Sequence, residues 1–316
     1  MITTAQPRRG PGYWLGVADT DYHRGVELTR QRRFAEAEQA LGLAVATLEM
    51  LAGDDPDATP GTNPEADTDP EADSAGATAW RQEVWRRLAL AHWRGALALH
   101  LDGRPAEAWM KANRAMEVGV AQLEQLRPGT GEHSEATAQL VTTIIDAAAA
   151  AADAGMTDVP LGLYDEAIER CGDDPHPCVR SVLSTALHNA ANAKLLHLTS
   201  LTGNDDRPRG DELRAILEDI AHLAGKSLAI RMEVVDETDV VSCWELASSE
   251  LMGAQVLVYC GERATAVELL ALGLQRVQSL GPDGRDLGAK AHQLVEAMDR
   301  LAPEEMNVAR EVGLLR

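Results

Sequence analysis

The chain has 316 residues, with 50 acidic against 29 basic side chains and a formal net charge of −21 at pH 7. Such a charge repels phosphate backbones and anionic lipid, so binding to nucleic acid or to a membrane surface is disfavoured as a general property. Aromatic residues make up only 3% of the chain, and β-branched residues rarely alternate with period two. Strands are therefore not expected, and the fold class is predicted to be all-α.

Residues 1–12 contain two prolines and two glycines and predict a flexible N-terminal tail. They include no apolar leader, and no stretch of about 18 uncharged apolar residues follows anywhere. Four cysteines in a chain of this length do not indicate a disulfide framework. These features predict a cytoplasmic protein without a membrane segment.

Apolar periodicity and turn residues predict a series of helices in chain order. Thr238 is the expected N-cap of the ninth helix, and the last helix is expected to cover the final hairpin. The ranges are 14–31, 34–51, 80–101, 105–126, 134–154, 158–171, 179–201, 211–235, 238–260, 263–280 and 286–301.

Residues 53–79 interrupt this series with eight acidic residues, four prolines and no Lys or Arg. Such a segment cannot bury enough apolar surface to offset the entropy lost on ordering. It predicts a disordered acidic insertion between the first two hairpins, acting either as a solvated linker or as an acidic tether for a basic partner.

The clearest hairpin is 80–126, where Gly103 follows one helix and Pro105 starts the next. The small residue Ala96 precedes the alanine Ala108 by twelve positions, and the same spacing joins Gly25 to Ala37 and Ala254 to Ala266. A weaker copy has Ala148, Gly155 and Pro160, with proline where the alanine should be.

This spacing resembles the tetratricopeptide repeat (TPR), which has about 34 residues. The segments that carry the resemblance are RGVELTRQRRFAEAEQALGLA, GALALHLDGRPAEAWMKANRA and GAQVLVYCGERATAVELLALG. The resemblance implies antiparallel helical hairpins stacked as a right-handed solenoid, forming a single domain over 13–316. The template does not fix the register of the fourth hairpin, 177–235.

No known catalytic motif occurs in a fitting context. Cys171, His176 and Cys178 form the nearest approach to a metal-ligand cluster, but their spacing fits structural zinc poorly and favours reduced cysteines beside a proline turn. No metal and no cofactor are expected.

In TPR-like proteins the first helix of each hairpin lines the concave face, and the resemblance therefore implies a set of ligand-binding residues there. Asn189 and Asn192 are the most suggestive members, because asparagine is a poor helix former and two occupy adjacent turns. The set is Tyr22, His23, Arg30, Trp93, Arg94, Leu97, His100, Asp146, His188, Asn189, Asn192, Met252, Gln255 and Tyr259. Packing between hairpins is the alternative role for Trp93 and the histidines.

A basic strip of Arg81, Arg86, Arg87 and Arg94 lies beside Trp80, Trp85 and Trp93. It could hold an acidic peptide or the acidic insertion itself. The main hypothesis is a non-catalytic module that binds a protein, a peptide or a small effector on its concave face. The alternatives are an enzyme with a closed polar pocket inside the solenoid and a homo-oligomeric scaffold.

Overall fold

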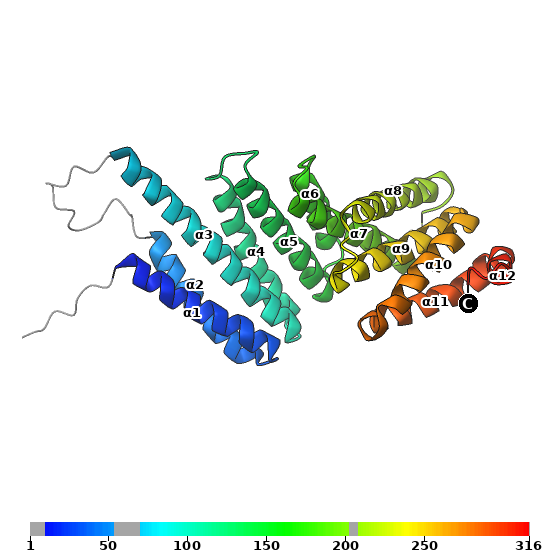
Figure 1. Ribbon diagram of the computed structural model, residues 1–316, viewed down its shortest axis with the longest axis horizontal. Coiled ribbons are helices and arrows are strands. Elements are labelled where there is room, and N and C mark those ends of the chain that lie inside the picture. The colour runs from blue at the N-terminus through cyan, green and yellow to red at the C-terminus, as the bar shows by residue number, and fades with distance from the viewer. Residues whose placement is uncertain (1–9, 54–69, 202–207, 316) are drawn as a thin grey trace, which may run out of the picture. The chain divides into compact units, whose positions relative to one another are not determined.

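The computed structural model describes residues 10–53, 70–201 and 208–315, and in that part of the chain it contains α- and 3₁₀-helices without any strand (Figure 1). None of the described helices is long and apolar enough to cross a membrane. The helices are α1 (Pro11–Arg30), α2 (Phe34–Gly53), α3 (Pro70–Leu101), α4 (Pro105–Leu123), α5 (Gly131–Asp153), α6 (Val159–Cys171), α7 (Pro177–Ser200), α8 (Asp211–Val234), α9 (Val240–Cys260), α10 (Arg263–Ser279), the 3₁₀-helix η2 (Gly281–Gly284), α11 (Arg285–Leu301) and α12 (Pro303–Glu311).

The chain divides into two compact units, one ending at Leu163 and one beginning at Tyr164. In the N-terminal unit α1 to α4 each pack on the next helix, and α3 also contacts α1 and α5. In the C-terminal unit α7 to α11 do the same, and α9 also contacts α7 and α11. Each unit is thus a stack of consecutive helices, an arrangement compatible with a helical repeat.

Four hairpins share one turn geometry in the same register. The residue seven positions after the small residue has a positive φ: Arg32 at 58°, Gly103 at 76°, Gly155 at 82° and Gly261 at 87°. One position later, a backbone N–H donates to the carbonyl five residues earlier, at 2.9–3.0 Å. The pairs are Arg33 to Leu28, Arg104 to Leu99, Met156 to Ala151 and Glu262 to Leu257. This bond closes the helix in the manner of a Schellman motif. The repeated spacing of the sequence is therefore a repeated backbone geometry.

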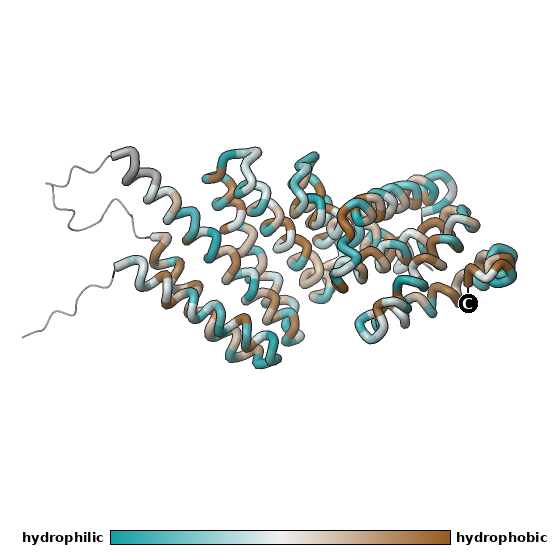
Figure 2. The backbone as a smooth tube through the Cα atoms, viewed as in Figure 1, coloured by the Kyte–Doolittle hydropathy of each residue, from teal (hydrophilic) through white to brown (hydrophobic). Residues whose placement is uncertain are grey.

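Small residues let the paired helices approach closely, as the sequence predicts. An ideal Cβ on Gly25 would lie 2.5 Å from Cγ of Leu41 on the facing helix. Ala254 and Ala266 are fully buried where α9 meets α10. In the fourth hairpin serines take this place: Ser184 of α7 and Ser227 of α8 are fully buried, and the Ser227 hydroxyl donates a 2.8 Å hydrogen bond to the Ser184 carbonyl. Hydrophobic and hydrophilic residues alternate along the helices, as Figure 2 shows.

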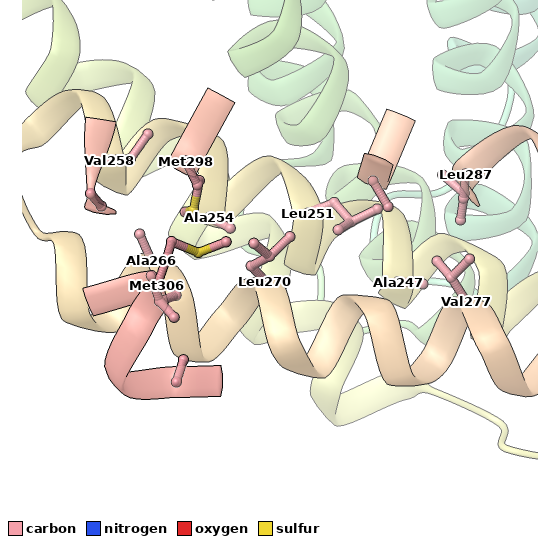
Figure 3. Close-up of a cluster of buried hydrophobic side chains, with 14 residues drawn as sticks. Ala247, Leu251, Ala254, Val258, Ala266, Leu270, Val277, Leu287, Met298 and Met306 are labelled. Atoms are coloured by element: carbon pink, nitrogen blue, oxygen red, sulfur yellow. The ribbon is translucent and has the colours of Figure 1, made fainter. Parts of the chain in front are cut away.

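The C-terminal unit has a continuous apolar core built from α9, α10, α11 and α12. Figure 3 shows Leu251 and Leu270 facing each other across α9 and α10, with Met298 and Met306 reaching toward Ala254 and Ala266. Both methionines are fully buried. The helix α12, which the periodicity did not predict, therefore contributes to this core through Met306.

Several helix boundaries differ from the expected ones, and three of the differences change a stated prediction. The helix α3 begins at Pro70 rather than at 80, so the last ten residues of the predicted acidic insertion are helical, and 54–69 lie outside the described residues. Proline at the first helical position followed by acidic residues is a helix-start signal that the composition of the segment concealed. The N-cap of α9 is Asp239, whose carboxylate accepts from the N–H groups of Val241 and Ser242, rather than Thr238. The helix α1 begins at Pro11, inside the predicted tail.

Candidate functional site

A pocket of about 340 Å³ lies in the C-terminal unit, lined by side chains of α7, α9 and α11. These are alternate helices of the stack, and the middle one, α9, contacts both of the others. The lining consists of His188, Asn192, Leu196, Ser248, Leu251, Met252, Gln255, Val258, Tyr259, Leu287, Lys290, Gln293, Leu294, Ala297 and Leu301. The volume is in the range that small-molecule sites occupy.

The polar end of the pocket is centred on His188. Its Nε2 lies 3.4 Å from the Ser248 hydroxyl and its Nδ1 lies 3.4 Å from the Ser249 hydroxyl. Burial, together with the positive charges of Arg231 and Lys290, lowers the pKa of His188 to about 4. The imidazole is therefore neutral at pH 7, with one N–H to donate and one nitrogen to accept.

Most of the other side chains that line the pocket are apolar. Leu251 and Leu287 are almost fully buried, whereas Leu196, Tyr259 and Leu301 are 61%, 44% and 41% exposed. Exposed apolar side chains gathered around a concave site are unusual for a surface that binds nothing. The pocket thus combines mostly apolar walls with a small number of polar side chains, the usual composition of ligand sites.

The structure brings together five of the predicted binding residues in this pocket: His188, Asn192, Met252, Gln255 and Tyr259. They come from α7 and α9, the first helices of two hairpins, as the resemblance implies. Asn189 is half-buried on α7 and does not line the pocket.

The residues of α11 were missed, because this helix was expected only to cover the last hairpin. Its pocket-lining positions 287, 290, 294, 297 and 301 recur every three or four residues and form one face. This spacing is visible in the sequence. Reading α11 as the first helix of a further hairpin, with α12 as the second, would have placed that face beside α9.

In the N-terminal unit the predicted binding residues mostly bond to one another. Trp93 Nε1 donates a 2.7 Å hydrogen bond to Asp146 Oδ2, and the Arg94 guanidinium lies 4.3 Å from the centre of the Trp93 ring. Burial raises the pKa of Asp146, while the Trp93 hydrogen bond and the charges of His100 and Arg94 oppose that rise. Farther along the same two helices, His100 Nε2 of α3 lies 2.7 Å from Asp153 Oδ2 of α5. These contacts join α3 to α5, which is the packing role considered as the alternative.

The remaining predicted residues of this unit do not form a shared site. Tyr22 is half-buried against the apolar core and its ring meets that of His23 edge-on. His23 and Arg30 are exposed on α1, and Leu97 is half-buried on α3.

The basic strip is largely neutralised by nearby carboxylates. Arg86 pairs with Glu83 at 2.7 Å, and Arg87 pairs with both Glu83 and Asp19. A second pocket, of about 450 Å³ between α3, α4 and α5, includes Arg86 but also Glu83, Glu132 and Glu135. An acidic peptide would meet these carboxylates, so the geometry does not favour it there.

The cysteine cluster weighed as a zinc site does not assemble. His176 Nδ1 lies 2.9 Å from Cys178 Sγ, but Cys171 is buried and its pKa is raised to about 12, mainly by burial. Within residues 10–53, 70–201 and 208–315, no three His, Cys, Asp or Glu side chains are grouped so that they could hold a metal ion.

Comparison with known proteins adds no further constraint: no protein-family model matches the chain, and no curated protein matches its sequence.

Proposed function

We propose that this chain is a non-catalytic binding module of the TPR-like helical-repeat type, and that the pocket between α7, α9 and α11 holds its ligand. The observation that carries the proposal is the convergence of His188, Asn192 and Gln255 with apolar side chains in one pocket of about 340 Å³. These three side chains are partly buried, and each carries hydrogen-bonding groups that a ligand in the pocket can meet.

The register of the turns supports the repeat assignment. Four hairpins place a positive φ seven residues after the small residue, and three follow it five residues later with a buried alanine. The pocket is lined by α7, α9 and α11, which occupy the position of first helices in successive hairpins. First helices form the surface on which the resemblance implies ligand binding, and α11 extends that surface beyond the predicted set.

An enzyme is the weaker alternative. Ser248 and His188 could be read as a nucleophile and its base. However, their separation of 3.4 Å is long for an activated pair, and a histidine with a pKa of about 4 is a poor base at pH 7. The neutral His188 is better suited to hydrogen bonding a ligand than to removing a proton.

A fragment screen by ligand-observed NMR tests the proposal with a matched pair of variants on α11. Ala297→Phe fills the pocket, whereas Ala289→Phe adds the same ring at an exposed position outside it. Circular dichroism and thermal melting establish that both variants fold. We expect fragments that bind the wild type and Ala289→Phe but not Ala297→Phe. If bound fragments are equally retained by Ala297→Phe, the pocket is not the binding site.

A further inference from the structure

The charge distribution of the pocket restricts the chemistry of its ligand. Of the described residues that line it, Lys290 is the only one with a charge at pH 7, because His188 is neutral. The lining thus carries a positive charge in a protein whose formal net charge is −21. A positive site on an acidic protein is not explained by its average composition.

The positive field extends to the buried end of the pocket. Burial is the main cause of the low pKa of His188, and the charges of Arg231 on α8 and Lys290 on α11 act in the same direction. The Arg231 charge is partly balanced, because its guanidinium pairs with Glu245 and donates a 2.9 Å hydrogen bond to the Thr185 hydroxyl. Lys290 is therefore the cation that a ligand entering the pocket can meet directly.

The same arrangement argues against other ligand charges. A protonated amine would be repelled by the like charge of Lys290. A phosphate would bring about two negative charges to a single lysine, without the bidentate arginine contacts that favour phosphate. A singly charged carboxylate matches one lysine, and the amides of Asn192, Gln255 and Gln293 supply further N–H donors.

The rest of the lining fits an apolar chain. Leu251, Val258 and Leu287 are buried in the lining, and Leu294 and Ala297 continue the apolar surface along α11 toward Leu301. Each methylene of a hydrocarbon chain buried here should tighten binding about fourfold. An amphipathic acid is thus matched at both ends.

We propose that the pocket between α7, α9 and α11 binds a monocarboxylate with an apolar chain, with the carboxylate at Lys290 and the chain against the leucines of α9 and α11. This inference rests on the proposed function, since it names the ligand class of the same pocket. The chemistry is shared by free carboxylic acids and by peptides that end in an apolar residue with a free C-terminal carboxylate.

Isothermal titration with octanoate and octanamide tests the carboxylate directly, because the two probes differ only in the head group. We expect octanoate to bind wild type at least about tenfold more tightly than octanamide, as a charge-assisted hydrogen bond allows. Lys290→Met should abolish that preference. The matched control, Lys226→Met, removes an exposed lysine of α8 outside the pocket and should preserve it.

A second pair of probes distinguishes the two sources of the carboxylate. Acetyl-Ala-Leu-Leu is titrated with a free and with an amidated C-terminus. Tighter binding of the free peptide than of octanoate assigns the pocket to peptide C-termini, and the reverse order assigns it to free acids.

The outcomes separate this inference from the proposed function. Equal binding of octanoate and octanamide, or a preference that survives Lys290→Met, overturns the carboxylate assignment while leaving the pocket as a binding site. If neither octanoate nor the free peptide binds, the carboxylate assignment is also wrong. The proposed function then stands or falls separately, on whether Ala297→Phe abolishes fragment binding.

Discussion

Trp93 and Asp146 join two helices of the N-terminal unit through a 2.7 Å hydrogen bond from the indole Nε1 to the carboxylate Oδ2. Both residues were predicted to face a ligand, yet each serves as the partner of the other. The bond holds α3 against α5. It also stabilises the ionised form of Asp146, which burial disfavours. Its contribution is to the packing of successive hairpins.

Trp93→Phe should therefore destabilise the protein by about 1–3 kcal/mol, because it leaves a buried acceptor without its donor. Asp146→Asn keeps an oxygen that can accept from the indole and removes the buried charge, so it should cost less. Urea denaturation of both variants measures the difference. A larger loss for Asp146→Asn than for Trp93→Phe would show that the charge, rather than the hydrogen bond, holds α3 to α5.

The close approach of α1 and α2 makes Gly25 sensitive to a single methyl group. A Cβ there would lie 2.5 Å from Cγ of the buried Leu41 and 3.3 Å from the carbonyl oxygen of Ala37. Gly25→Ala should cost about 1–3 kcal/mol through overpacking. Gly16→Ala, in the same helix with no atom within 4 Å of its Cβ, should instead stabilise by about 0.5–1 kcal/mol. Thermal melting of the two variants should shift in opposite directions, and equal shifts would contradict the interface.

Arg32 occupies the left-handed position that glycine fills in the other three hairpins, with a φ of 58°. A non-glycine residue pays roughly 1–2 kcal/mol in this region, partly offset because glycine is more flexible when unfolded. Arg32→Gly is therefore expected to raise the free energy of unfolding by up to about 1 kcal/mol. Arg32→Ala keeps the strain and should give no such gain in the same chemical denaturation experiment. A similar gain in both variants would mean that the arginine side chain, not its backbone conformation, is unfavourable.

His92 is buried in α3, and neither of its ring nitrogens has a hydrogen-bond partner among the described residues, although Glu49 approaches to 3.7 Å. Burial, followed by the charges of Lys111 and Arg114, lowers the pKa of His92 to about 4. Above pH 6.5 the folded and unfolded chains both hold this imidazole neutral. As the pH falls from 6.5 to 4, the unfolded chain gains a proton that the folded chain does not bind. Stability therefore falls by up to about 1.4 kcal/mol per pH unit for this group.

His92→Leu removes this linkage, so the variant should lose less stability than wild type between pH 6.5 and 4. His188 contributes a loss of the same sign, so some slope should remain. The exposed variant His292→Leu is the control, since its side chain is 76% exposed. Urea denaturation across this pH range gives the slopes. An unchanged slope in His92→Leu would show that His92 takes up its proton in the folded protein as readily as in the unfolded one.

The sequence predicted the parts of the fold that are encoded locally. Gly103 and Gly261 mark helix ends because only glycine adopts a positive φ without strain, and Ala254 and Ala266 mark a close helix contact. Local rules could not predict the pairing of Trp93 with Asp146, which are 53 residues apart. Both residues were assigned to the inner face of their helices. Whether two such side chains bind each other or a ligand depends on the distance between the helices.

The same limit applies to the pocket. Positions on α7 and α9 were predicted because the repeat template covers or adjoins them. The third wall was missed because α11 lies beyond the last recognisable repeat, although its apolar face has helical spacing. Lys290, on which the proposed ligand chemistry depends, lies among the mostly apolar residues of α11 that line the pocket. Its proposed role in binding a carboxylate depends on the residues of α7 and α9 on the other side of the pocket.

The most direct test of the central claim is ¹³C-methyl NMR of methionine-labelled protein, titrated with a ligand from the fragment screen. Met252 lines the pocket, whereas Met110 is 64% exposed in the N-terminal unit, and Met252→Leu assigns the relevant resonance. The account predicts a saturable shift of the Met252 methyl, with that of Met110 unchanged, and loss of the shift in Ala297→Phe. A ligand that binds and shifts Met110 but not Met252 would contradict it.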